Sequence, residues 1–244
     1  MDTHEGTIRA GEMESHTVGV QRLYTEKLNE YRRFISLFRS RDAIRALLES
    51  SGLLRPKLRV LDAGAGFGTA TFALLDALHH RGKEAEAIEA FDLTPAMLAR
   101  FQAELDSRGV SQVRLKQANV LELDASTSML EYVARPDLSQ ALSALGARLA
   151  RHGTLLVVIT RKNWITRVLI ERWWQAARYS REELREAFAI AGFRNLVFRR
   201  FPFRYCWHSL SNHVVMATRG ETAQGITGAA KALGTMPPTG SDDK

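Results

Sequence analysis

The sequence is poor in cysteine and has no long uncharged apolar run. A single cysteine, Cys206, excludes a disulfide framework and a cysteine-rich metal site. The longest apolar stretches, Leu155–Ile159 and Ile165–Trp174, are too short or too interrupted by charge to span a bilayer. No N-terminal apolar run resembles a signal peptide. We therefore expect a cytoplasmic protein without a metal centre or a transmembrane segment.

Length and composition point to one globular domain with appendages. The chain has 244 residues, of which 45% are apolar, enough for one α/β domain and short of two. The net charge of +7 permits binding to nucleic acid or an anionic membrane, but solvated surfaces carry similar charge. The polar ends, residues 1–18 and 220–244, lack apolar periodicity, and we predict disordered tails there.

The region 19–52 has apolar residues near helical spacing and ends at Gly52, a typical helix stop. This pattern predicts two helices before the rest of the domain. With Tyr24 and Tyr31 among their residues, they could cover a binding site as a lid.

Strand and helix patterns alternate through residues 53–219, which predicts an α/β fold with a doubly wound, mainly parallel sheet. Ser180 and Glu183 form a capping box that starts one of the helices. The expected strands are Leu58–Asp62, Glu86–Phe91, Gln112–Gln117, Thr154–Thr160, Asn195–Phe201 and His213–Thr218. The expected helices are Thr69–Arg81, Pro95–Ser107, Leu138–Arg151 and Arg181–Ala191.

The segment after the first strand has the pattern of a ligand loop. Asp62 is followed by glycines at positions 64, 66 and 68, which let the backbone turn sharply and approach a ligand closely. The loop contains an acid and no lysine, and a carboxylate would repel a bound pyrophosphate. The pattern favours a ligand with a cationic or amino-acid end. A plain strand-to-helix turn is the alternative.

The second strand ends at Asp92, just before Thr94-Pro95 and a helix. An aspartate in this place can accept both hydroxyl groups of an unphosphorylated ribose. The alternative is a purely local role, because an aspartate before a helix also serves as a cap.

Four segments in this order resemble the motifs of class I S-adenosylmethionine-dependent methyltransferases. The resemblance covers roughly Leu53 to Thr218, and it implies a Rossmann-like fold with a C-terminal antiparallel hairpin. The four segments are Leu61-Asp62-Ala63-Gly64-Ala65-Gly66-Phe67-Gly68, Phe91-Asp92-Leu93-Thr94-Pro95-Ala96-Met97-Leu98, Gln117-Ala118-Asn119-Val120 and His152-Gly153-Thr154-Leu155-Leu156.

The resemblance implies S-adenosyl-L-methionine as the cofactor and assigns it a set of binding residues. Asp62 would hold the amino group and Asp92 the ribose hydroxyls. Asn119 would face the adenine amino group, since an amide oxygen can accept a hydrogen bond there, and Val120 would offer its backbone N–H. The implied set is Asp62, Gly64, Ala65, Gly66, Gly68, Asp92, Leu93, Asn119 and Val120.

The chain departs from the family pattern just beyond Asn119. Family members continue through a crossover into a fourth strand beside the first, whereas residues 120–130 are compressed here. Parallel neighbours need a crossover of about a dozen residues. Either the fourth strand is a short remnant or the sheet has a gap at this place.

We expect methyl transfer to a small-molecule acceptor through an oxygen, nitrogen or carbon atom, without a nameable catalytic base. Residues 163–174 and the histidines 208 and 213 are candidates to face the acceptor, although loop histidines are usually solvated. An RNA- or protein-directed methyltransferase is the alternative. Only the basic charge supports it, with Arg194, Arg199, Arg200 and Arg204 near the closing strands, and the Asn/Asp-Pro-Pro-aromatic signature is absent. A non-catalytic cofactor-binding protein is a third class.

Overall fold

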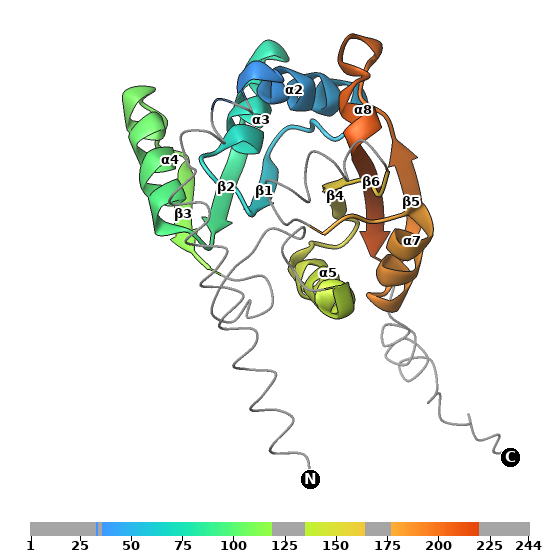
Figure 1. The fold of residues 1–244 in the computed structure, drawn as a ribbon. Helices are drawn as coiled ribbons and strands as arrows, with labels where there is room; N and C mark the ends of the chain where they lie inside the picture. The colour runs from blue at the N-terminus through green and yellow to red at the C-terminus, as the bar shows by residue number, and fades with distance from the viewer. Residues whose placement is uncertain (1–32, 34–35, 119–134, 164–176, 220–244) are drawn as a thin grey trace, which may run out of the picture.

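The computed structural model describes residues 33, 36–118, 135–163 and 177–219 (Figure 1). Its first half contains α2 (Ser40–Ser51), β1 (Leu58–Ala63), α3 (Thr69–His80), β2 (Ala85–Asp92), α4 (Pro95–Ser107) and β3 (Val113–Gln117). Its second half contains η2 (Arg135–Asp137), α5 (Leu138–Arg148), β4 (Thr154–Thr160), α7 (Arg181–Ile190), β5 (Phe193–Arg199), η3 (Phe203–Tyr205), α8 (His208–Ser211) and β6 (Asn212–Arg219).

The strands form two three-stranded sheets among the described residues. In the first sheet the order is β1-β2-β3 and all pairs are parallel, with Asp62 opposite Ala90. In the second the order is β4-β6-β5 and both pairs are antiparallel, with Val157 opposite Val215. The predicted α/β class, the parallel sheet and the C-terminal antiparallel hairpin are confirmed.

Local signals in the sequence set several element ends. The capping box is present, because Glu183 N donates to Ser180 Oγ at 3.2 Å and Ser180 N donates to Glu183 Oε2 at 2.6 Å. The predicted end of α5 at Arg151 was wrong, since Leu149 is already extended at φ −69° and ψ 132°. The predicted strand at roughly Asn195–Phe201 is present but runs from Phe193 to Arg199, so both predicted ends were late. Its register shifts around Asn195, which has a φ of 54°.

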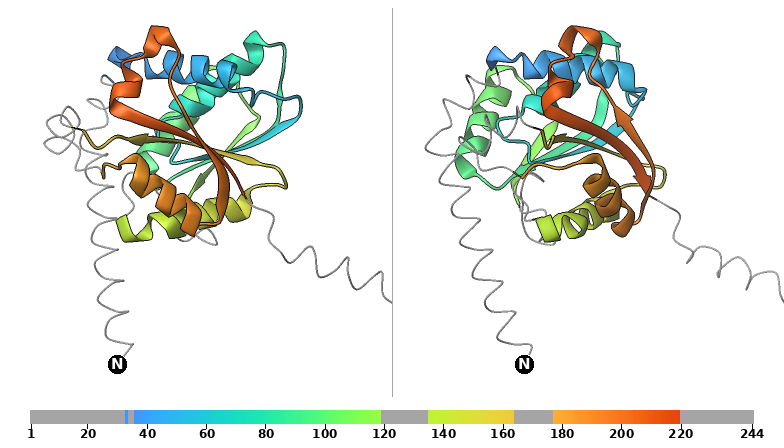
Figure 2. Two further views of the ribbon diagram at one scale, coloured as in Figure 1. Left: turned by 90° about the vertical axis from the view of Figure 1, so that its right-hand side faces the viewer. Right: turned by 45° about the vertical axis from the view of Figure 1, so that its right-hand side comes forward.

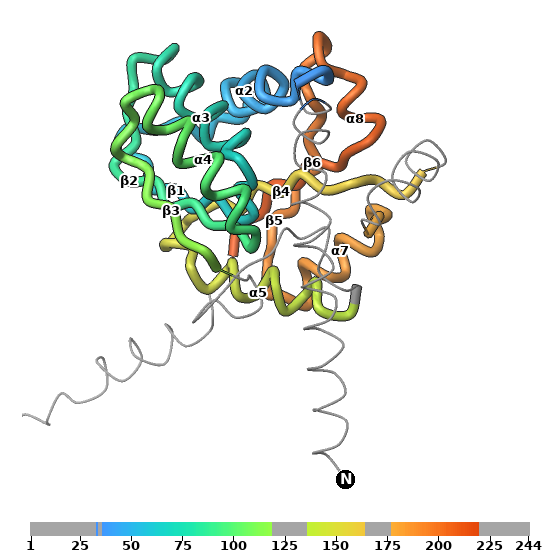
Figure 3. Tube along the Cα trace, turned by 60° about the vertical axis from the view of Figure 1, so that its left-hand side comes forward, coloured from blue at the N-terminus to red at the C-terminus, as the bar shows by residue number. Residues whose placement is uncertain are grey.

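Helices cover the strands on both faces, so the fold is doubly wound. Figure 2 shows α2 and α3 above the strands and α5 and α7 below them, and the tube in Figure 3 shows the same layering. Side chains alternate accordingly along β4. Val157 and Ile159 pack with α5 and α7, whereas Leu156 packs toward α2 and α3. Both faces of this sheet are therefore buried in apolar cores.

No described strand lies between β1 and β4, where the fourth strand of the family pattern would be. The two sheets share apolar packing there, because Leu155 and Leu156 of β4 reach clusters that also contain residues of the first sheet. Leu61 of β1 is 38% exposed and Val158 of β4 is 36% exposed. The compressed segment 120–130 lies outside the described residues, so the remnant and the gap both stay predictions.

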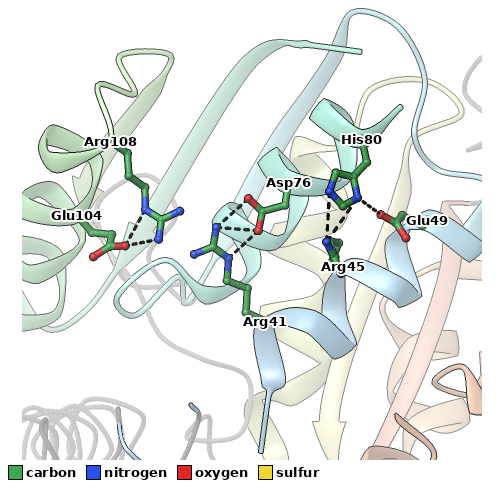
Figure 4. A network of polar contacts seen from close by, with 7 residues as sticks. All are labelled: Arg41, Arg45, Glu49, Asp76, His80, Glu104 and Arg108. Carbon is green, nitrogen blue, oxygen red and sulfur yellow. Dashed lines mark hydrogen bonds and ion pairs between the residues drawn. The ribbon is translucent and has the colours of Figure 1, made fainter. Parts of the chain in front are cut away.

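Polar contacts fasten α2 to α3 (Figure 4). Arg41 forms a bidentate pair with Asp76, with Nε and Nη2 donating at 2.7 and 2.8 Å. Its guanidinium also lies 5.3 Å from the centre of the Phe72 ring. Farther along, His80 contacts Glu49 at 3.2 Å. The described part of region 19–52 is thus packed on the domain, and its predicted lid role stays a prediction.

The described ranges contain neither a membrane-spanning helix nor a cluster of metal-ligating side chains. No helix there is long and apolar enough to cross a membrane. No group of three or more His, Cys, Asp or Glu residues is arranged to hold a metal ion in the same ranges.

Amide exchange should be faster in Leu58–Leu61 and Leu155–Ile159 than in α7, the reverse of the usual order in which central strands are best protected. Each of these strands pairs with a described strand along one edge only, so its other edge must find different partners. Hydrogen exchange followed by mass spectrometry on the native protein measures this.

The internal control is β2, which pairs along both edges and should exchange slowly. If β1 and β4 are instead the most protected parts of the chain, the sheet is complete and a residue segment between 119 and 134 supplies its missing member.

Candidate functional site

The glycine loop connects β1 to α3 and is fastened to the end of β2. The N–H groups of Gly64 and Ala65 both donate to the Phe91 carbonyl oxygen, at 3.0 and 2.9 Å. The backbone therefore folds over the carboxyl end of the neighbouring strand. Ligands bind at this end of the strands in open α/β sheets.

Gly66 and Gly68 have different roles in this loop. Both have a positive φ, 55° and 86°. A Cβ on Gly66 would meet no atom within 4 Å, whereas a Cβ on Gly68 would lie 2.3 Å from the ring of Phe101. Phe101 is fully buried in α4 and meets Phe72 edge-on at 5.2 Å. Gly66 therefore leaves open space for a ligand, while Gly68 leaves space for the core.

Asp92 ties the loop to the second strand. Its carboxylate accepts hydrogen bonds from Gly66 N and from Thr94 N, both at 2.8 Å. The side chain is only 4% exposed, and burial raises the pKa of Asp92 above its ordinary value, while the Thr94 and Gly66 N–H groups act against this rise. Each carboxylate oxygen can accept a further hydrogen bond. Asp92 is thus both a loop anchor and a candidate acceptor for ligand hydroxyls.

Asp62 is held by a residue that the sequence analysis missed. Thr71 Oγ1 in the first turn of α3 donates to Asp62 Oδ2 at 2.5 Å, and Thr71 itself is buried. Burial raises the pKa of Asp62, and the negative charge of Asp92 raises it further, while the Thr71 hydroxyl lowers it. A hydroxyl residue early in the helix after the loop was the available signal.

The two carboxyl groups form an acidic pair without a cation among the described residues. Their hydrogen-bond donors there are hydroxyl and backbone N–H groups, among them the Thr71 hydroxyl and the N–H groups of Gly66 and Thr94. Buried charges are ordinarily paired. A ligand that brings a positive charge or several hydroxyl groups would therefore complement this place, and a ligand that brings phosphates would be repelled.

The remaining predicted cofactor residues divide into two groups. Ala65 and Leu93 are buried beside the acidic pair in sequence and space. Asn119 and Val120 lie outside the described residues. The residue before them, Ala118, donates its N–H to the Asp92 carbonyl oxygen at 3.1 Å. The chain therefore leaves β3 at the same end of the sheet as the acidic pair.

The candidate acceptor histidines are buried, so solvated loop histidines were a wrong expectation. His208 Nε2 donates to the Phe38 carbonyl oxygen at 2.9 Å and fastens α8 to the start of α2. His213 lies in β6 opposite Ile159. Burial, together with the positive charges of Arg161 and Arg181, lowers the pKa of His213 to about 4. The aromatic residues 164–174 lie outside the described residues.

Comparison with known families supports the class of the domain. Residues 60–153 match the family model described as a methyltransferase domain. This range includes the glycine loop, the acidic pair and the strands β2 and β3. No curated protein matches the chain significantly in sequence.

Several solved structures, methyltransferases among them, resemble most of the chain in fold. Magnesium protoporphyrin IX methyltransferase from Synechocystis PCC 6803, with bound SAH, has a TM-score of 0.63 at 17% identity, covering 84% of this chain and 99% of that one. The pyocyanin biosynthetic protein PhzM has a TM-score of 0.62 at 15% identity, covering 81% and 62%. An O-methyltransferase family 2 protein from Planctomyces limnophilus DSM 3776, in complex with apigenin, has a TM-score of 0.58 at 16% identity, covering 77% and 61%.

Replacing Gly68 with alanine should lower the free energy of unfolding by about 2–5 kcal/mol, combining left-handed strain and overpacking against Phe101. The matched control is Gly109→Ala, because Gly109 has a φ of 64° and open space around its Cβ position. This control should lose only the strain, about 1–2 kcal/mol. Urea denaturation of both variants measures the difference.

The double variant Gly68→Ala with Phe101→Leu should lose less stability than the two single changes added together. Equal losses in Gly68→Ala and Gly109→Ala, or strict additivity in the double variant, would contradict the packing role of Gly68.

Proposed function

We propose that this chain is a class I S-adenosylmethionine-dependent methyltransferase that transfers the cofactor's methyl group to a small-molecule acceptor. The enzyme class and the cofactor are supported by the methyltransferase-domain match over residues 60–153 and by neighbours of the same fold with bound SAH or SAM. The acceptor class and the residue assignments below are parts of the proposal.

The acidic pair at the ends of β1 and β2 carries this proposal. S-adenosylmethionine has an ammonium group at its amino-acid end and two ribose hydroxyls. These groups match the buried carboxyl group of Asp92 and the half-buried one of Asp62, neither of which has a cation beside it among the described residues. A dinucleotide would bring a pyrophosphate close to Asp62, where its charge is unfavourable. The arrangement therefore favours the methyl donor over NAD.

Each predicted residue has a proposed part in holding the cofactor. Asp62 would bind the ammonium group and Asp92 the ribose, with the Gly66 backbone beside them. Gly64, Ala65 and Leu93 would line the same place, and Asn119 and Val120 would bind the adenine. Gly68 would act indirectly, because its missing Cβ makes room for Phe101.

Methyl transfer needs few chemical groups from the protein itself. The cofactor supplies an electrophilic methyl group on a sulfonium, which an acceptor atom can attack directly. The chain's own contribution would be to hold two reactants in line and to exclude water. No residue is assigned as a catalytic base.

The small-molecule acceptor is supported by the structural neighbours. One of them is a magnesium protoporphyrin IX methyltransferase, and another is an O-methyltransferase family 2 protein in complex with apigenin. One argument for an RNA acceptor is weakened, because Arg199 donates to the Ser51 carbonyl oxygen at 3.1 Å and so serves the fold.

S-adenosylmethionine or its demethylated product should bind the purified protein, and NAD should not compete with either. Isothermal titration calorimetry measures both. Affinity for S-adenosylmethionine should fall as the pH is lowered toward the raised pKa values of Asp62 and Asp92, because protonated carboxyls no longer attract the ammonium. Absence of heat with both methyl-cofactor species, or tighter binding of NAD, would overturn the assignment.

Replacing Asp92 with alanine should weaken cofactor binding at least tenfold. Hydrogen bonds to a charged group are worth about 1.5–3 kcal/mol each, and the ribose would lose two of them. The matched control is Asp106→Ala, which removes an exposed carboxylate from α4 that bonds only Gln102 among the described side chains. Asp76 is unsuitable, because its pair with Arg41 joins two helices.

Because Asp92 also anchors the loop, the stability of both variants must be measured beside their affinities. Equal cofactor affinities for Asp92→Ala and Asp106→Ala would show that the ribose site lies elsewhere.

A further inference from the structure

The connection between β5 and β6 exposes a group of large apolar side chains. It contains η3 and α8 and projects beside the start of α2 (Figures 1 and 2). Phe203 is 94% exposed, Leu210 58% and Trp207 40%. Single exposed apolar residues are ordinary, but a concentration of them on one segment marks an interaction site.

A residue from another part of the chain extends this surface. Leu37, which precedes α2, is 80% exposed. Its neighbour Phe38 accepts the hydrogen bond from His208, which places the two segments side by side. We call the four exposed residues Leu37, Phe203, Trp207 and Leu210 the apolar tip.

The exposure of these side chains is built into an ordered turn. Tyr205 N donates to the Pro202 carbonyl at 2.7 Å, and Ser209 N donates to the Cys206 carbonyl at 2.9 Å. Ser209 Oγ also accepts from Phe201 N at 2.9 Å. Beneath the turn, Phe201 and Tyr205 are buried against α2. The inner aromatic residues anchor the turn, Phe203 is held in water, and Trp207 meets the Tyr205 ring edge-on while part of its surface stays exposed.

The connection that carries most of the apolar tip has charge of one sign. Residues 200–211 contain two arginines, Arg200 and Arg204, and no aspartate or glutamate. Arg200 and Arg204 are exposed in this connection, and neither forms an ion pair with a described residue. Arg39 nearby is neutralised by Asp42. The surroundings of the apolar tip therefore attract anions.

We propose that the apolar tip binds the surface of an anionic lipid membrane. Phe203 and Trp207 would enter the boundary between headgroups and acyl chains, where amphipathic aromatic rings are favoured. Arg200 and Arg204 would lie against the lipid phosphates, each strengthening binding about fivefold.

Other occupants fit these observations less well. A second copy of the chain in a symmetric dimer would bring Arg200 and Arg204 against the same arginines of its partner. Single-stranded RNA stacks on aromatic rings, but Leu37 and Leu210 offer no stacking surface. An anionic membrane would contact both kinds of residue, because its acyl chains accept the aliphatic side chains and its phosphates attract the arginines.

Vesicle sedimentation of the full chain tests the proposal. The protein should bind vesicles of equal parts phosphatidylcholine and phosphatidylglycerol at least tenfold more tightly than vesicles of phosphatidylcholine alone, and added salt should reduce the difference. The double variant Phe203→Ser with Trp207→Ser should lose at least tenfold in affinity for the anionic vesicles.

Matched variants separate the apolar and electrostatic contributions. Arg200→Gln with Arg204→Gln should weaken binding to anionic vesicles about twenty-fold or more and leave the weak binding to neutral vesicles unchanged. The controls Ile190→Ser and Arg114→Gln change an exposed isoleucine of α7 and an exposed arginine of β3. Both should bind as the unchanged protein does.

Thermal melting and cofactor titration of every variant show whether the fold persists, and both should be unchanged. Equal binding to both kinds of vesicle, no binding to either, or equal losses in the controls would overturn the proposal. The proposal would also be overturned if the protein did not bind vesicles but bound RNA or formed a dimer, and the same tip variants abolished that binding. Vesicle binding by a protein that fails to bind S-adenosylmethionine would support the apolar tip and reject only the proposed function.

Discussion

The fold around the candidate site depends on one carboxylate, that of Asp92. It reaches from the end of β2 to the N–H of Gly66 in the glycine loop and to the N–H of Thr94 before α4. Three elements are thereby joined at one buried group. The same group has a raised pKa because burial disfavours its charge. The carboxylate that organises the site is therefore also one whose negative charge is unfavourable in its buried position.

The raised pKa of Asp92 has a consequence for ligand binding. A carboxyl whose pKa rises on folding binds its proton more tightly in the folded state. Its charge therefore lowers the free energy of unfolding at neutral pH, and the protein recovers this stability as the pH falls through the raised pKa. Asp62 acts in the same direction, and the two charges reinforce each other. An ammonium group close to this acidic pair would offset both costs, which links affinity for a cationic ligand to the burial of the acids.

The sequence was enough for the parts of the site that are local. The acid before the glycines and the acid at the end of the next strand follow from strand and turn patterns within a few residues, and the structure places Asp62 and Asp92 at neighbouring strand ends. The packing role of Gly68 was beyond the sequence, because it depends on where α4 crosses α3 and places Phe101. Thr71 was missed because its position early in α3 marks it only once Asp62 is known to face the first turn of that helix.

The burial of His208 and His213 could also not be predicted from the sequence around them. His208 follows a turn-rich stretch and His213 begins a strand, which predicts solvent contact. Their burial comes from α2, which lies far away in the sequence, and from the packing of β4 and β5 around β6. The same tertiary contacts leave Phe203 and Trp207 outside, so only the fold separates the anchoring aromatic residues from the exposed ones.

Among the described residues, the two sheets meet through apolar packing and not through a strand ladder. Leu155 and Leu156 point to opposite faces of β4, and each reaches a core that also holds residues of the first sheet. Apolar burial is non-directional, so it can join two sheets without a hydrogen-bonded ladder between them. Leu61 of β1 and Val158 of β4 are partly exposed. Backbone groups on the facing strand edges need water or another segment as partners, because each buried unpaired group would cost about 1–3 kcal/mol.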